Sequence, residues 1–191
     1  MKILVVGGAG YIGSHMAKTL VGAGVSVVVL DDFSTGYRQA VRYGDLVEGS
    51  FADRALLDKL FTDHQFDAVM HFASFIQVGE SVRDPAPYYR NNVANTQVLL
   101  DAMLAHGIKR FVFSSTAAIF GEPTRIPIDE SLPSAPINPY GRSKWMVEQI
   151  LADYESAYGL ESVCLRYFNA AGADPEGELG ERHDPETHLI P

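Results

Sequence analysis

A tyrosine and a lysine four residues apart could share acid–base chemistry on one face of a helix. Tyr140 and Lys144 follow Asn138 and Pro139. Asparagine is a preferred N-cap and proline suits the first helical position, so Tyr140 is expected in the first turn, with Lys144 one turn further on. A nearby ammonium and a helix N-terminus both favour the phenolate, which predicts a pKa of Tyr140 below about 10 and a base for an alcohol. Spacing alone also fits an ordinary surface helix.

A glycine-rich turn near the N-terminus predicts a phosphate-binding site. Gly7, Gly10 and Gly13 follow an apolar run at residues 3–6. Glycine permits a sharp turn from strand to helix, the approach of a pyrophosphate to bare backbone, and close packing of the helix on the sheet. The helix N-terminus adds free amides and the positive end of a dipole. A tight structural turn would need the same glycines, so the context of the pattern matters.

That context includes Asp31 and Asp32, which follow a second apolar run, 18 residues after Gly13. A carboxylate at this point can accept hydrogen bonds from both hydroxyls of an adenosine ribose and would repel a 2′-phosphate, which favours NAD over NADP. A solvated acid at a strand end is the alternative. Strand, glycines, helix, strand and acid in this order predict dinucleotide binding.

Short β-branched runs alternate with segments of helical period along the whole chain. The runs occupy residues 3–6, 25–30, 67–72, 110–115 and 162–167, and the helical segments occupy 11–23, 55–64, 88–106 and 139–158. Continuous apolarity in such short runs indicates strands buried on both faces of a parallel sheet. The sequence therefore predicts an α/β fold, a Rossmann-like doubly wound parallel sheet with helices on both faces and with functional residues after the strands.

Composition excludes several classes of partner. The 191-residue chain has a formal net charge of -9, so no basic face for nucleic acid or an anionic membrane is expected. The single cysteine, Cys164, excludes a disulfide within the chain and fits a reducing cytoplasm. No targeting or membrane-spanning segment is recognised. The six histidines, among them His183 and His188, lack the spacing of zinc ligands, so no metal is expected.

Taken together, these residues resemble the extended short-chain dehydrogenase/reductase family. The glycine turn, Asp31, the serine-rich strand end and the Tyr140-x-x-x-Lys144 pair carry the resemblance, which runs from Met1 to the end of the chain. A finer match, to the sugar-nucleotide 4-epimerases of that family, rests on residues 7–15, 71–73, 78–82, 88–93 and 165–172. It implies an NAD-dependent epimerase that interconverts UDP-glucose and UDP-galactose through a 4-keto intermediate. It also implies a possible homodimer formed by helices 88–106 and 139–158.

The resemblance assigns a role to each candidate residue. Tyr140 would take the proton of the sugar 4-hydroxyl, Lys144 would bind the nicotinamide ribose, and Thr116 would bind the reacting oxygen. Asn169 would contact the UDP-sugar together with Thr116 and Tyr140. The residues that the resemblance places against the cofactor are Gly7, Gly10, Tyr11, Ile12, Gly13, Asp31, Asp32, Phe51, Phe72, Ala73, Asn91, Thr116, Tyr140, Lys144 and Phe168.

Departures from the family pattern also inform the prediction. Ser50 stands where an aspartate near the adenine is common, and Ile76 stands where some epimerases have a cofactor-binding lysine. Ala117 and Ala118 occupy the positions at which related 4,6-dehydratases carry an aspartate and a glutamate. Elimination of water needs that additional acid and base, so the two alanines favour epimerisation.

The resemblance also bears on domain organisation. Residues 1–172 are expected to form the NAD-binding domain, and residues 173–191 a loop at the start of a smaller C-terminal substrate domain that is largely absent. We therefore expect low activity from this chain alone. The alternatives are a 4-epimerase of another nucleotide sugar and an isolated NAD-binding module. Sensors on this fold typically lack the tyrosine–lysine pair, which speaks for an enzyme.

Overall fold

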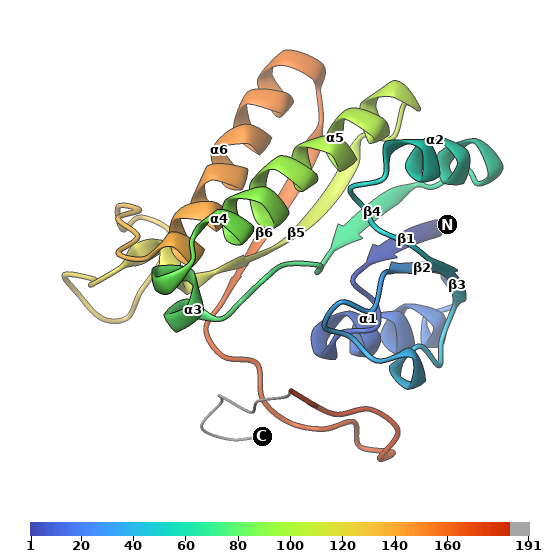
Figure 1. Cartoon of the computed structure of the whole chain (residues 1–191), viewed down its shortest axis with the longest axis horizontal. Helices are drawn as coiled ribbons and strands as arrows, with labels where there is room; N and C mark the ends of the chain where they lie inside the picture. Colours follow the sequence, from blue (N-terminus) through green and yellow to red (C-terminus); the bar gives the residue numbers. More distant parts are fainter. Residues whose placement is uncertain (184–191) are drawn as a thin grey trace.

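The computed structural model describes residues 1–183, and within them one parallel sheet of six strands organises the fold (Figure 1). The strands are β1 (Lys2–Val6), β2 (Ser26–Asp31), β3 (Asp45–Glu48), β4 (Ala68–His71), β5 (Arg110–Thr116) and β6 (Glu161–Tyr167). Their order in the sheet is β3-β2-β1-β4-β5-β6. Because the order reverses between β1 and β4, a crevice for a ligand is expected where the carboxyl ends of these two strands diverge.

Helices cover both faces of this sheet. Helix α1 (Tyr11–Gly22) lies on one face, and α2 (Arg54–Asp63), α5 (Thr96–Ala105) and α6 (Pro139–Tyr158) lie on the other (Figure 1). Shorter elements connect them: α3 (Val78–Arg83), α4 (Ala86–Tyr88), the 3-10 turns η1 (Arg38–Ala40) and η3 (Ala117–Phe120), and the π-helical segment η2 (Tyr89–Asn95). The arrangement confirms the predicted doubly wound α/β fold.

Alternate residues of the strands supply two separate cores. Leu4 and Val6 of β1 pack with the apolar faces of α2, α5 and α6, whereas Ile3 and Val5 pack with Ala17 of α1. All five side chains are buried. Side chains of a strand point alternately to opposite faces of a sheet, so a strand covered on both faces must be apolar at every position. This explains the unbroken apolar run that opens the chain.

Two predicted features differ in the structure. The predicted helix 88–106 is divided, because the segment that joins α4 to α5 is π-helical over Tyr89–Asn95. Within it, Asn92 is fully buried and its side chain bonds the backbone of Phe75 and the hydroxyl of Ser143. The wider turn accommodates an inward polar side chain that apolar periodicity does not register. The sequence analysis also missed β3 and α3, which have only four and six residues.

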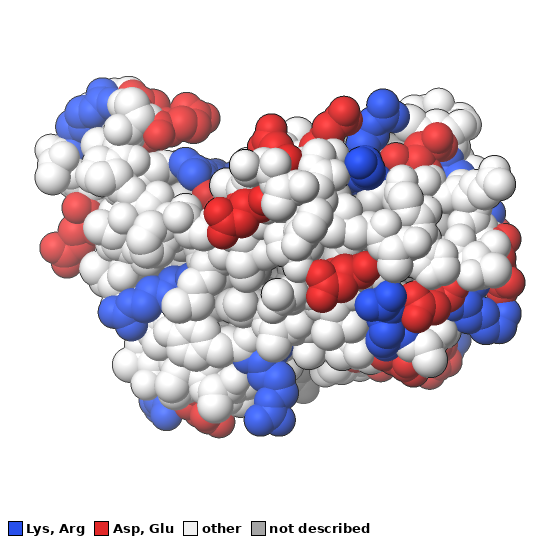
Figure 2. All heavy atoms as spheres, turned by 90° about the horizontal axis from the view of Figure 1, so that it is seen from above, with Lys and Arg blue, Asp and Glu red and all other residues white. Residues whose placement is uncertain are grey.

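The surface agrees with the predicted absence of a basic face where it can be seen. On the face drawn in Figure 2, acidic and basic side chains are interspersed rather than gathered by sign. Among the helices of residues 1–183, none is long and apolar enough to cross a membrane.

Candidate active site

In the turn after β1, Gly7 and Gly13 are closely packed against backbone, whereas Gly10 stays open. Gly7 has φ +82, and a Cβ there would lie 2.5 Å from the amide nitrogen of Ala73. A Cβ on Gly13 would lie 2.2 Å from the carbonyl oxygen of Gly7. At Gly10 a Cβ would meet nothing closer than that same oxygen, at 3.4 Å. Gly10 is also the N-cap of α1 and supplies no side-chain cap, so the first amides of α1 remain available to an anion.

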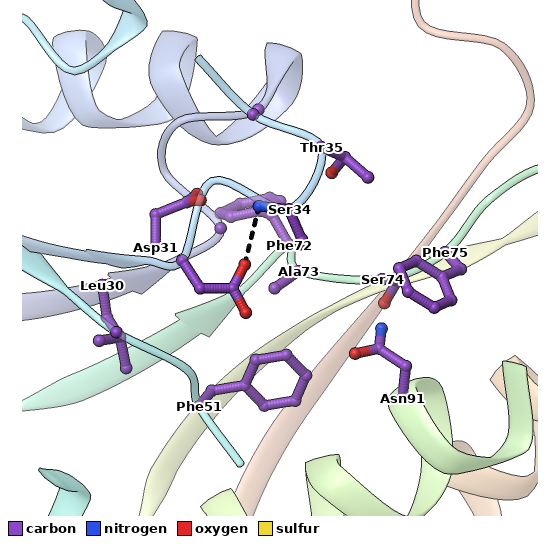
Figure 3. Close-up of a pocket in the computed structure, with 15 residues that line it drawn as sticks. Leu30, Asp31, Ser34, Thr35, Phe51, Phe72, Ala73, Ser74, Phe75 and Asn91 are labelled. Carbon is purple, nitrogen blue, oxygen red and sulfur yellow. Dashed lines mark hydrogen bonds between the residues drawn. The ribbon is translucent and has the colours of Figure 1, made fainter. Parts of the chain in front are cut away.

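The carboxylate at the end of β2 is tied to this turn. One oxygen of Asp31 accepts a hydrogen bond from the amide of Ala9 at 2.8 Å, and the other accepts one from the amide of Phe33 at 2.9 Å. Burial raises the pKa of Asp31, although the two amide hydrogen bonds act in the opposite direction. Each carboxylate oxygen has a second lone pair, so both could still accept a hydroxyl. Figure 3 shows Phe51, Phe72 and Asn91 around the adjoining space.

Helix α6 begins where the sequence predicts, with Tyr140 in its first turn and Lys144 one turn further on. The side chain of Asn138 caps the helix by accepting a hydrogen bond from the amide of Gly141 at 2.8 Å. Lys144 is 1% exposed. Its Nζ donates to the Ser74 hydroxyl and to the Ser114 carbonyl, both at 2.7 Å. Burial lowers the pKa of Lys144 to about 7, because leaving water disfavours its charged form.

The predicted pKa of Tyr140 is wrong for this structure. Burial raises the pKa of its phenol, the hydrogen bond with Thr116 opposes that rise, and the neighbouring Tyr167 adds to it. Sequence reasoning counted the charge of Lys144 but not the cost of removing a phenolate from water. In addition, the Lys144 ammonium is directed to two other oxygens. Burial of Tyr140 therefore favours the protonated phenol.

Two adjoining cavities bring all the predicted site residues together. The larger has a volume of about 460 Å³ and extends from Gly10 and Tyr11 to Tyr140 and Lys144. The cavities share Gly7, Gly10, Thr35, Phe72 and Ser74. The predicted residues that line the smaller cavity are Gly7, Gly10, Asp31, Asp32, Phe51, Phe72, Ala73 and Asn91. Those that line the larger are Gly7, Gly10, Tyr11, Ile12, Gly13, Phe72, Thr116, Tyr140, Lys144, Phe168 and Asn169. Their individual roles remain predictions.

The residues that depart from the patterns of related enzymes differ in whether they line a cavity. Ile76 lines the larger cavity, where it contributes an apolar side chain and no charge. Ser50 lines neither cavity. Ala117 and Ala118 also line the larger cavity, and the amide of Ala118 donates to the Thr116 hydroxyl oxygen at 3.1 Å. These two alanines offer neither an acid nor a base beside Thr116.

Several polar residues of the larger cavity were not predicted from the sequence, among them Ser74, Glu181 and His183. Ser74 follows the end of β4, so the rule that ligands bind beyond the carboxyl ends of strands could have found it. Glu181 and His183 pair at 2.8 Å and come from the segment that returns after β6. The charge of Glu181 also contributes, after burial, to the raised pKa of Tyr11. No local pattern marks the return of this segment.

The fold and the cavity fit a dinucleotide. An open glycine turn, an uncapped helix N-terminus and a carboxylate after β2 lie in the order that a pyrophosphate and an adenosine ribose require. A continuous lining then leads to a tyrosine, a lysine and a threonine hydroxyl. These features define the class: a doubly wound α/β protein with a dinucleotide-type crevice and a tyrosine–lysine pair.

Comparison with known proteins gives the family. The model of the NAD dependent epimerase/dehydratase family matches residues 3–191, so the chain belongs to this family. UDP-glucose 4-epimerase of Rhizobium meliloti (strain 1021) is 57% identical over 190 residues, which are 100% of this chain and 58% of that protein. The counterpart in Rhizobium leguminosarum bv. trifolii is 56% identical over 99% of this chain and 58% of its own length.

Solved structures of UDP-glucose 4-epimerases have the same fold as this chain. The crystal structure of UDP-glucose 4-epimerase from Brucella ovis in complex with NAD has a TM-score of 0.97 at 57% identity, covering 98% of this chain and 58% of that one. The enzyme from Bifidobacterium longum, in complex with NAD⁺ and UDP, has a TM-score of 0.92 at 38% identity, with coverage of 96% and 58%. The chain thus spans a little over half the length of the relatives that it matches.

Proposed function

We propose that this chain binds NAD and carries the catalytic residues of a UDP-glucose 4-epimerase. The observation that carries the proposal is that Thr116, Tyr140 and Lys144 line the same 460 Å³ cavity as the glycine turn. Relatives named UDP-glucose 4-epimerase, at 56–57% identity, support the choice of substrate. The alanines at positions 117 and 118 support epimerisation over elimination of water.

The two ends of the dinucleotide would be held by different elements. The open backbone at Gly10 and the first amides of α1 would bind the pyrophosphate. Asp31 would accept the hydroxyls of the adenosine ribose, and its charge would exclude a 2′-phosphate. The Nζ of Lys144 would exchange one of its present acceptors for the nicotinamide ribose. Bound in this way, NAD would take a hydride from C4 of the sugar and later return it to the opposite face.

The proton travels separately, through Tyr140. In its deprotonated form Tyr140 takes the proton of the 4-hydroxyl, and in its protonated form it returns a proton to the 4-keto oxygen. Burial favours the protonated form, which would suit the return of a proton in the second half of the reaction. The interaction of Thr116 with the tyrosine phenol supports a role for its hydroxyl in binding the reacting oxygen. Asn169, which lines the same cavity, would contact the UDP-sugar.

A binding and release assay tests the cofactor half of the proposal. We expect the purified chain to bind NAD, to bind NADP much more weakly, and to release NAD on denaturation. Calorimetric titration with the two dinucleotides measures the preference, and Asp31→Ala provides the matched loss of the ribose contact. Equal affinity for NAD and NADP in the unmodified chain would contradict the assignment of Asp31, and no affinity for either would contradict the proposed function.

Two further properties extend the proposal. Helices α5 and α6 lie side by side on one face of the sheet (Figure 1), and we propose that a homodimer forms there, which sedimentation equilibrium tests.

We also propose a cytoplasmic location. Partial burial raises the pKa of the Cys164 thiol to about 12, so this cysteine is suited to a structural role rather than to redox chemistry. Cell fractionation tests the location.

A further inference from the structure

The segment after β6 folds back onto α1 and is held there chiefly by one lysine. This segment, residues 172–179, is named the strap, and in Figure 1 it runs beside α1. The Nζ of Lys18 lies 2.9 and 2.8 Å from the two carboxylate oxygens of Asp174, 2.5 Å from Glu176 and 3.1 Å from Glu178. The Lys18 side chain is 20% exposed and that of Asp174 is 7% exposed.

These three acids depend on the lysine. Carboxylate oxygens of Asp174, Glu176 and Glu178 all lie within 4.8 Å of one another. Without a cation between them, three like charges at this separation repel. The charged form of Lys18 is stabilised by its hydrogen bonds with all three carboxylates. These bonds raise the pKa of Lys18, and those with Asp174 and Glu176 contribute most. Lys18 is therefore the cation that all three acids share, whereas Arg42 pairs with Glu178 alone.

The remaining contacts of the strap lie toward its ends, and they include an ion pair of Arg42 with Glu178 at 3.7 Å and a hydrogen bond from Arg42 to the Glu178 carbonyl at 3.4 Å. The hydroxyl of Tyr11 donates to the Gly172 carbonyl at 2.5 Å, and the hydroxyl of Tyr43 donates to Glu178. Within the strap, the amide of Asp174 donates to the carbonyl of Leu179 at 2.9 Å, which closes a compact turn. The strap thus has an internal shape of its own, and Lys18 provides its charged anchor to α1.

The strap matters because both of its flanks line the larger cavity. Phe168 and Asn169 precede it and Glu181 follows it, and all three line the cavity that also contains the glycine turn and Tyr140. We propose that Lys18 is a positioning residue, a latch that holds this wall closed over the dinucleotide and whose opening limits dinucleotide release. The proposal rests on the proposed function, because it takes the occupant of the cavity to be NAD. Since the latch is ionic and partly exposed, salt weakens it.

The first experiment measures the strap itself and needs no ligand. Amide hydrogen exchange of residues 172–179 is compared in the unmodified chain, Lys18→Met, Lys18→Arg and the control Lys59→Met. Lys59 pairs with Asp63 on α2, and its side chain is 72% exposed. We expect faster exchange of the Asp174, Gly177 and Glu178 amides in Lys18→Met only, with protection kept in Lys18→Arg. Unchanged exchange in Lys18→Met overturns the latch.

The second experiment measures dinucleotide release. NAD dissociation from the same four proteins is followed at about 0.1 M and about 1 M NaCl, which shortens the Debye length from about 10 Å to about 3 Å. We expect dissociation from Lys18→Met to be about fivefold faster at low salt, the scale of one to a few partly exposed ion pairs, and to lose most of its salt dependence. Faster strap exchange with unchanged dissociation overturns the gating role. Failure of the unmodified chain to bind NAD overturns the proposed function instead, while the exchange experiment still decides the latch.

Discussion

The burial of Lys144 predicts an unusual dependence of stability on pH. The pKa of its amine falls from 10.5 to about 7 on folding, because the side chain is buried and holds only neutral acceptors. Between these two values the unfolded chain holds one more proton than the folded chain. The free energy of unfolding therefore rises with pH in this window, and the cost of burial is fully present only below about pH 7. The perturbation that isolates this contribution is Lys144→Met.

The magnitude follows from the two pKa values. One pKa unit corresponds to about 1.4 kcal/mol. Between about pH 7 and about pH 9.5, the free energy of unfolding of the unmodified chain should rise by roughly 3 kcal/mol relative to Lys144→Met. Taking the difference between the two proteins removes the titration of all other groups that the substitution leaves unchanged.

Urea denaturation followed by circular dichroism, without NAD, measures this difference at several pH values. Lys59→Met is the matched control, because Lys59 is exposed and should leave the slope with pH unaltered. Parallel curves for the unmodified chain and Lys144→Met would refute the reasoning, since they would mean that the lysine stays charged when buried. A slope of opposite sign would mean that an acidic partner raises its pKa.

Three further predictions concern the binding turn and the core. Asp31→Asn should weaken NAD binding about tenfold to a hundredfold, because a charged acceptor of ribose hydroxyls is lost, and calorimetry that finds unchanged affinity would exclude the ribose contact. Gly13→Ala should destabilise the fold by several kcal/mol, roughly the cost of severe overpacking. The reason is that the added Cβ would lie 2.2 Å from the Gly7 carbonyl oxygen. An unchanged midpoint of urea denaturation would contradict that geometry. Glu148→Ala should lower the free energy of unfolding by about 3 kcal/mol, because Arg166 loses a buried partner at 2.6 Å. Arg166→Met should lower it by a similar amount, and thermal unfolding of both variants measures the two values.

Much of the fold was predictable because the sheet is buried on both faces. Apolar runs such as residues 3–6 have to be continuous in such a sheet, and they identified five of the six described strands. The missed strand, β3, has four residues at the edge of the sheet, none of them fully buried, so it carries no apolar pattern. The π-helical segment was missed for a related reason, since the buried Asn92 is polar.

The candidate site was predictable where chemistry constrains the local sequence. The glycine turn and Asp31 each occupy a position whose backbone or charge admits few alternatives. Contacts between distant segments were not predictable in the same way. Lys18 meets Asp174 across 156 residues, and no spacing signals that pairing. The pKa of Tyr140 was mispredicted because its burial depends on the folded environment rather than on its neighbours in sequence.

Substitution of Tyr140 tests its proposed role in the transfer of the proton. The NAD-loaded chain and its Tyr140→Phe variant are incubated with UDP-galactose, and the formation of UDP-glucose is followed, with the bound NAD of each sample measured as a loading control. The account predicts similar NAD content and conversion at least about a hundredfold slower in Tyr140→Phe, the usual scale for loss of an acid–base group. Equal conversion by the two proteins would contradict it.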